Sequence, residues 1–148
     1  MKSIVEAVAT INEREFMINF LDQLSEKMYS SSFDVKSAMD DVPQRALGIV
    51  SEIFTSAFSK GRETLVREIE KARDDLENLP IVTLTTTIEP TEDFVWKIKN
   101  WFLENNGQNV LVDFKIDKSL IGGAIIESGG YRTEYSFRKY FAQRKEKN

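Results

Sequence analysis

The sequence contains neither cysteine nor histidine among its 148 residues. Without thiols it has no disulfide bond, no thiolate nucleophile and no cysteine-ligated zinc. Without imidazole it has no Ser-His-Asp triad, no histidine-based metal site and no side chain with an ordinary pKa near neutrality. Catalysis would have to use carboxylate, lysine or tyrosine groups, which need burial to tune their pKa values. We therefore expect a protein that is not an enzyme, with no catalytic residue, no metal site and no cofactor.

The chain also has no excess of positive charge. The chain has 20 Lys and Arg residues against 24 Asp and Glu residues, a net charge of -4 and a pI near 5.0. Nucleic-acid binding depends on neutralising phosphates, and binding to an anionic membrane surface depends on polybasic segments. Neither kind of partner is expected here, which leaves another protein as the expected partner.

Long apolar runs are missing too. No window approaches the roughly 20 apolar residues that a membrane-spanning helix needs, so we expect no direct membrane insertion. Residues 1–16 carry three glutamates and lack the apolar stretch of a signal peptide. These features predict a soluble intracellular protein, of bacterial type rather than one imported into an organelle.

What the sequence does contain changes character at Pro80. The hydrophobic fraction of 41% and the charged fraction of 30% are those of an ordinary globular protein. Residues 1–79 have helical patterns almost throughout, whereas β-branched runs, turn glycines and one amphipathic helix follow them. We expect an α+β fold, with a helical region at residues 1–79 and a small second domain at residues 80–148.

The helical region contains one long apolar stripe. Asn12 followed by Glu15 is a capping-box pattern that predicts a first helix, and Pro43 predicts the start of a second one. If this second helix is unbroken to about residue 78, it is roughly 50 Å long. Gly61 is its weak point, because glycine in a helix costs about 1 kcal/mol relative to alanine, so a break there is the alternative. The stripe consists of Leu47, Val50, Phe54, Phe58, Gly61, Leu65, Ile69, Ala72 and Leu76.

The second domain is expected to have the order β-α-β-β-β-α. Thr91 can cap the first helix, and the acidic Glu92 and Asp93 in its first turn suit the helix dipole. Gly129-Gly130 is a tight hairpin signal. The expected strands are residues 81–88, 110–116, 124–128 and 131–135, and the expected helices begin near residues 92 and 136.

The helix after Thr91 is apolar on two sides. Its expected buried face consists of Phe94, Ile98, Trp101 and Phe102. At about 100° of rotation per residue, Trp96 projects from the opposite side, and Leu103 lies two turns along that side. Because Trp is over-represented among interface hot spots, Trp96 and Leu103 are candidate partner-interface residues. The alternative is that the helix of residues 62–78 covers Trp96.

Gly122-Gly123 could be interpreted as a phosphate-binding loop. A nucleotide site places its glycines between a strand and a helix N-terminus, whereas these two precede the strand-like residues 124–126. The favoured interpretation is a turn with φ > 0 before a strand, in which Asp117 and Ser119 act as local turn groups.

Two segments carry a resemblance to a known family. The first is Asp117, Ser119, Leu120, Ile121, Gly122 and Gly123, which follow a hydrophobic strand. The second is Glu134, Ser136 and Arg138, at the start of a short amphipathic helix. The combined pattern resembles the C-terminal signature of delta (OSCP-like) subunits of F-type ATP synthases, with Glu134 where the family favours Asp and Phe141 where it favours Leu.

The resemblance implies a structural role. In this family an N-terminal helical bundle binds N-terminal segments of alpha subunits, and a C-terminal domain meets the ends of the b-type stalk subunits. The subunit thereby holds the catalytic head against the torque of the rotor. The resemblance implies a cytoplasmic protein, peripheral on the inner face of the bacterial plasma membrane through the ATP synthase. The helical region before Pro80 is shorter than the usual bundle of the family.

Three other functions compete with this one. The long stripe from Leu47 to Leu76 suits an E-type stalk subunit of a V/A-type ATPase, which also joins a long helix to a compact α/β end. A stand-alone adaptor could bind an unrelated helical partner through Trp96 and Leu103. A small enzyme using carboxylate or lysine groups is disfavoured, because no cluster of polar residues converges in the sequence. The Glu134-x-Ser136 pattern favours the delta-type subunit over the E-type one.

Overall fold

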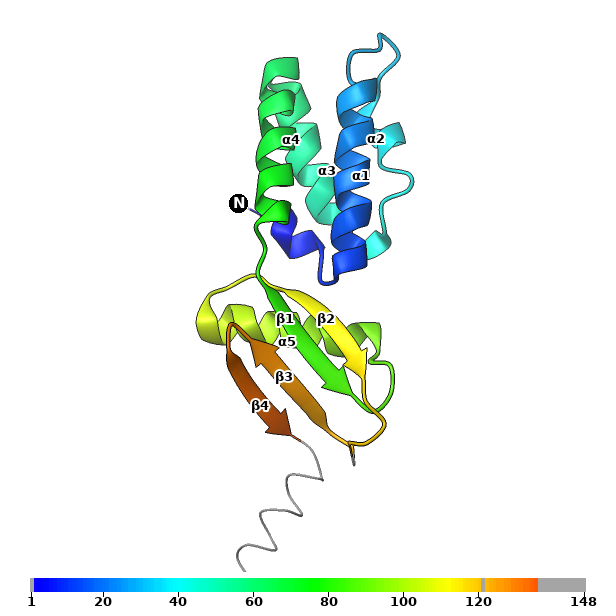
Figure 1. Ribbon diagram of the computed structural model, residues 1–148. Coiled ribbons are helices and arrows are strands. Elements are labelled where there is room, and N and C mark those ends of the chain that lie inside the picture. Colours follow the sequence, from blue (N-terminus) through cyan, green and yellow to red (C-terminus); the bar gives the residue numbers. More distant parts are fainter. Residues whose placement is uncertain (1, 121, 136–148) are drawn as a thin grey trace, which may run out of the picture. The chain divides into compact units, whose positions relative to one another are not determined.

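The computed structural model describes residues 2–120 and 122–135 of the chain. The chain divides into two compact units, residues 1–79 and residues 80–148. The first is helical within its described part, and the second contains a four-stranded sheet and a helix (Figure 1). The expected α+β class is confirmed.

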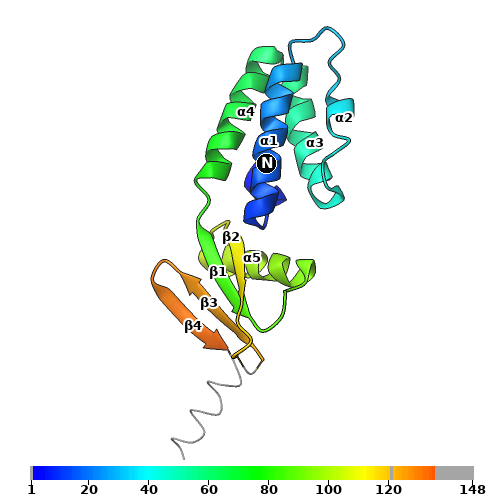
Figure 2. The ribbon, with the colours of Figure 1, turned by 45° about the vertical axis from the view of Figure 1, so that its right-hand side comes forward.

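The first unit is a small bundle. Its elements are η1 (Ile4–Ala7), α1 (Ile11–Lys27), α2 (Val35–Ala38), α3 (Gln44–Ser59) and α4 (Arg62–Glu77). Helices α1, α3 and α4 lie side by side in both views, and contacts join α3 to α4 and α1 to α4 (Figures 1 and 2). In its core the rings of Phe20 and Phe54 meet edge to face, with centroids 6.4 Å apart. The largest fully buried side chains around them are Met17, Leu21, Leu24, Met28, Leu65 and Leu76.

The long helix is not continuous, and the alternative of a break at Gly61 is what the structure shows. The chain reverses at Gly61, so that the stripe is divided between α3 and α4, which pack against each other. Gly61 has φ +116° and ψ 162°, a conformation that only glycine adopts readily. The physical reason lies in burial: folding the stripe back on itself buries Phe54 and Leu65 completely, whereas one continuous helix would leave the stripe without a partner within this unit.

The first helix also begins earlier than expected. Thr10, rather than Asn12, is its N-cap, and the Thr10 hydroxyl oxygen accepts a hydrogen bond from the backbone N–H of Glu13 at 3.1 Å. The Thr10 hydroxyl in turn donates to the Glu13 carboxylate at 3.2 Å. Thr10 and Glu13 therefore have the capping spacing expected of Asn12 and Glu15, two residues upstream.

The second unit is built on a mixed sheet. Its elements are β1 (Ile81–Thr86), α5 (Glu92–Asn106), β2 (Leu111–Ile116), β3 (Ala124–Ser128) and β4 (Tyr131–Tyr135). The strand order is β2-β1-β3-β4, with β1 parallel to β2 and the other pairs antiparallel. The β-α-β-β-β order is as expected, and the bounds of β3 and β4 match the expected ones. The final expected helix, from Ser136, lies outside the described residues.

Helix α5 covers one face of this sheet (Figures 1 and 2). Thr91 caps its start by accepting from the N–H of Phe94 at 3.2 Å, and Gly107 ends it with φ +66°. Its Phe102 packs with Val82 of β1 and with Val110 in a buried cluster. The register places Leu84 of β1 beside Ile126 of β3 on the same face. This face is therefore the apolar one.

Candidate partner-binding surfaces

The segment between β2 and β3 is a folded turn. The Asp117 carboxylate accepts hydrogen bonds from the backbone N–H of Ser119 at 2.9 Å and from its hydroxyl at 2.7 Å. Leu120 follows and is buried. Gly122 and Gly123 have φ values of +70° and +76°, which lead the chain into β3. These residues form the turn that connects β2 to β3. The glycines precede a strand rather than a helix N-terminus, as expected for a turn and not for a phosphate-binding loop.

The sheet brings the two family-motif segments close together. Glu134 of β4 is the register partner of Ile125 in β3, two residues after Gly123. Ser136 lies outside the described residues. Across residues 2–120 and 122–135, no group of three or more Asp, Glu, His or Cys side chains could hold a metal ion. In that part of the chain, the motif therefore shows a structural arrangement and no cluster of metal ligands.

The burial of several α5 side chains differs from the expectation from sequence. Trp96 is 8% exposed and belongs to the buried side, whereas Phe94 and Trp101, expected to be buried, are 38% and 52% exposed. The expectation that Phe94 and Trp101 are buried is therefore wrong, whereas the partner-interface role of Trp96 and Leu103 stays a prediction; Leu103 is half-buried.

Lys99 is only 2% exposed and lies in the middle of the buried side of α5. Its ammonium group donates a hydrogen bond to the carbonyl of Val110, just before β2, at 3.0 Å. A buried ammonium group needs such acceptors, because burial without a hydrogen bond is costly. This contact joins the middle of α5 to the residue just before β2, and a hydrophobicity pattern cannot reveal it.

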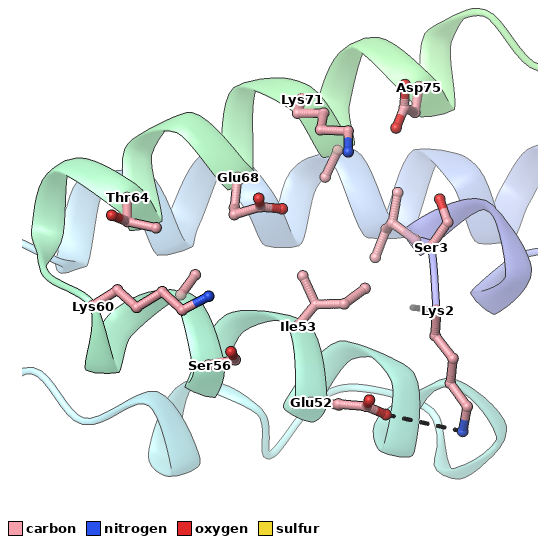
Figure 3. Close-up of a pocket in the computed structure, with 13 residues that line it drawn as sticks. Lys2, Ser3, Glu52, Ile53, Ser56, Lys60, Thr64, Glu68, Lys71 and Asp75 are labelled. Carbon is pink, nitrogen blue, oxygen red and sulfur yellow. Dashed lines mark ion pairs between the residues drawn. The ribbon is translucent and has the colours of Figure 1, made fainter.

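The first unit has a groove between η1, α3 and α4. Its volume is about 260 Å³. Ile4, Ile53, Ala57 and Ala72 form its apolar part. Charged groups of both signs surround it, and Lys2 pairs with Glu52 at 4.0 Å across one end (Figure 3). The other polar lining residues are Ser3, Ser56, Lys60, Thr64, Glu68, Lys71 and Asp75.

A groove with an apolar part and rim charges of both signs is suited to an amphipathic helix rather than to a small polar ligand. Sequence patterns do not reveal this groove, because its walls come from three separate segments. The small residues Ala57 and Ala72 were the available signal, since they leave space between two helices. A second, smaller hollow of about 190 Å³ lies where η1, α1 and the start of α3 meet, lined by Val8, Phe16, Met17 and Pro43 among others.

The second unit has a groove of about 350 Å³ beside α5, which we call the α5 groove. One wall is α5, with Ile98, Trp101, Phe102 and Asn106; the other is the β3–β4 hairpin, with Ile126, Ser128, Tyr131 and Thr133. Trp101 and Phe102 stack edge to face with ring centroids 5.1 Å apart. Tyr131 is 83% exposed. This groove combines exposed aromatic rings with an apolar base.

Charged side chains outside these grooves form ion pairs on the surface of the first unit. Arg73 of α4 pairs with Asp22 of α1 and, at 3.3 Å, with Glu77 one turn further along its own helix. All three side chains are about half exposed, so these pairs contribute at most about 1 kcal/mol. In the described part of the chain, no helix is both long and apolar enough to cross a membrane.

Comparison with known proteins gives two matches. A sequence model of the family described as ATP synthase delta (OSCP) subunit matches residues 23–147, which include most of both units. The ATP synthase subunit delta of Sulfurihydrogenibium azorense is 30% identical over 122 residues, covering 80% of this chain. The chain spans 63% of the length of that relative.

Proposed function

Because the chain belongs to the ATP synthase delta (OSCP) subunit family, we propose that it is a non-catalytic peripheral-stalk (stator) subunit of a proton-translocating F-type ATP synthase. The observation that carries this proposal is the extent of the family match, which runs through the helical unit as well as the sheet unit. A stator subunit has to bind the catalytic head and the stalk at the same time. Two separate units, each with its own apolar surface, suit that task.

In this proposal the second unit contacts b-type stalk subunits. We assign this contact to the exposed side of α5, with Phe94 and Trp101, in place of Trp96 and Leu103. Phe94 and Trp101 are seven residues apart, so they lie on one side of the helix, two turns from each other. Exposed aromatic side chains at this spacing fit the apolar stripe of another helix.

The first unit is proposed to contact N-terminal segments of alpha subunits through the groove between η1, α3 and α4. Rim residues of both signs, such as Lys60 and Glu68, can pair with the charged sides of an amphipathic helix, while Ile53 and Ala57 contact its apolar side. Through these two contacts the protein would be peripheral to the bacterial plasma membrane, on its inner face. The E-type alternative loses its main support, because it rested on an unbroken long helix.

The proposal is tested by binding experiments with the full chain. Purified chain should retain a b-type stalk fragment at micromolar concentration, and Phe94→Ser should weaken this binding about tenfold, with Asn100→Ser on the same helix as the matched control. Ser56→Trp fills the groove of the first unit and should abolish binding of an alpha N-terminal peptide. Thr55→Trp, which lies outside the groove, should leave it intact. No retention of either fragment by the unmodified chain would overturn the stator assignment.

A further inference from the structure

Strand β2 lies at one edge of the four-stranded sheet (Figure 1). Within residues 2–120 and 122–135, β1 is its neighbour on one side, and no strand pairs with its other side. A free edge of this kind presents unpaired backbone N–H and C=O groups, to which a further strand can pair. The outer edge of β2 is therefore a candidate site for contact with another chain.

The backbone groups that face this edge follow from the hydrogen bonds to β1. The N–H of Leu111 donates to the carbonyl of Pro80 at 2.9 Å. The N–H of Asp117 donates to the carbonyl of Thr86 at 2.8 Å. Because successive residues of a strand direct these groups to opposite sides, the odd-numbered residues bond to β1 and the even-numbered ones face the free edge. The residues of β2 that face it are Val112, Phe114 and Ile116.

The side chains of these three residues lie on the apolar face of the sheet. Val112 is the register partner of Val82, which packs against Phe102 of α5. Towards the end of β2 this face is only partly covered, because Phe114 is 37% exposed and Ile116 is 51% exposed. Exposed apolar side chains on an edge strand favour pairing with a further strand.

We propose that β2 pairs with β2 of a second copy of the chain, antiparallel and centred on Phe114. In this register Phe114 lies opposite itself, and Val112 lies opposite Ile116 of the copy. These pairs consist of residues whose backbone groups face the free edge, so each pair exchanges both of its hydrogen bonds. The contact is two-fold symmetric, and both copies use the same surface. It covers the exposed side chains of Phe114 and Ile116.

The charged residues of β2 favour a second copy as the partner. Asp113 and Lys115 alternate with the apolar residues, so their side chains lie on the opposite face of the sheet. In the register centred on Phe114, Asp113 of each chain lies opposite Lys115 of the other. Opposite charges at directly opposing positions stabilise a strand pair, whereas a lysine without such a partner opposes pairing at an edge. The strand is therefore complementary to itself, and an unrelated strand would need a matching sequence of its own.

Pairing through β2 goes beyond the proposed function and does not rest on it. It uses neither Phe94 nor Trp101, which are assigned to the stalk contact, and no residue of the groove in the first unit. Loss of dimerisation can therefore be distinguished from loss of stalk binding.

Sedimentation velocity of the full chain over a series of concentrations provides the first test. The natural chain should show an equilibrium between monomer and dimer. Asp113→Lys and Lys115→Asp should each raise the dissociation constant of the dimer about tenfold, because like charges then oppose each other. An equimolar mixture of these two variants should dimerise as tightly as the natural chain, because every lysine again faces a carboxylate.

Arg132→Glu supplies the matched control. Arg132 lies on β4, at the other edge of the sheet, and its substitution changes the charge by the same amount as Lys115→Asp. It should leave the dissociation constant unchanged, and an equal weakening would assign the effect to overall charge instead of β2. A natural chain that stays monomeric at every concentration would overturn the proposal. A mixture that dimerises no more tightly than the separate variants would overturn it too.

Crosslinking provides a second test that does not change the charges. The natural chain has no cysteine, so an introduced cysteine reacts without background. Phe114→Cys faces its own copy across the symmetry axis and should be joined to it by a short bismaleimide. Thr133→Cys, also exposed but on β4, should react between chains at least fivefold more slowly. Equal rates for the two variants would contradict pairing at β2.

Discussion

Replacement of Gly61 by alanine tests the chain reversal between α3 and α4, because the two possible structures predict effects of opposite sign. At φ +116° and ψ 162°, Gly61 has a backbone conformation that costs an alanine about 1–3 kcal/mol. An added Cβ would meet no atom within 4 Å, so no steric contact adds to this cost. We therefore expect Gly61→Ala to lower the free energy of unfolding by about 1–3 kcal/mol.

In one continuous helix, the same substitution would raise the free energy of unfolding by about 1 kcal/mol, because alanine is the better helix former. Gly48 supplies the matched control, since it lies within α3 and an added Cβ there also meets nothing within 4 Å. We expect Gly48→Ala to stabilise the protein by about 0.5–1 kcal/mol.

The assay is urea denaturation of the full chain, followed by circular dichroism at 222 nm, for the natural sequence and both variants. The comparison of midpoints is valid if the slopes stay equal. A Gly61→Ala variant that is as stable as Gly48→Ala, or more stable than the natural sequence, would refute the reversal and restore the single long helix.

Three further substitutions test separate contacts by the same denaturation assay. Phe54→Ala removes a fully buried ring and should cost about 3–5 kcal/mol; a loss below 1 kcal/mol would contradict its central position in the bundle. Asp117→Ala removes the acceptor for two Ser119 hydrogen bonds and should cost about 1 kcal/mol, largely recovered in Asp117→Asn, and an equal loss in both would argue against the turn. Arg73→Ala should cost less than about 1 kcal/mol, with a difference that shrinks at high salt; a larger, salt-independent loss would indicate packing instead.

Local signals in the sequence predicted the main features of the second unit correctly. Gly129-Gly130 set the β3–β4 hairpin, and Thr91 and Gly107 set the ends of α5, because caps and tight turns depend on residues that are adjacent in the chain. The family resemblance rested on the same kind of signal, in the turn from Asp117 to Gly123. These features need no knowledge of the rest of the fold.

What could not be predicted depends on contacts between distant residues. The apolar stripe continues through Gly61 with helical spacing, and spacing alone cannot show that the direction of the chain reverses there. The burial of Lys99 accompanies a hydrogen bond from its ammonium group to the carbonyl of Val110, which a hydrophobicity pattern does not show. Both grooves join residues from different elements, so single periodic patterns do not reveal them.

The place where β1 enters the sheet has a mechanical consequence. Only residues 78–80 separate α4 from β1, and β1 is an inner strand with β2 on one side and β3 on the other. A pulling force on the first unit therefore reaches the second along the axis of β1. A force along β1 loads the hydrogen bonds to both neighbouring strands in shear, so these bonds share it. In a hairpin pulled apart at its end, the bonds would instead break one after another. This strand order alone raises the resistance of the sheet to rupture when the chain is pulled from its first unit.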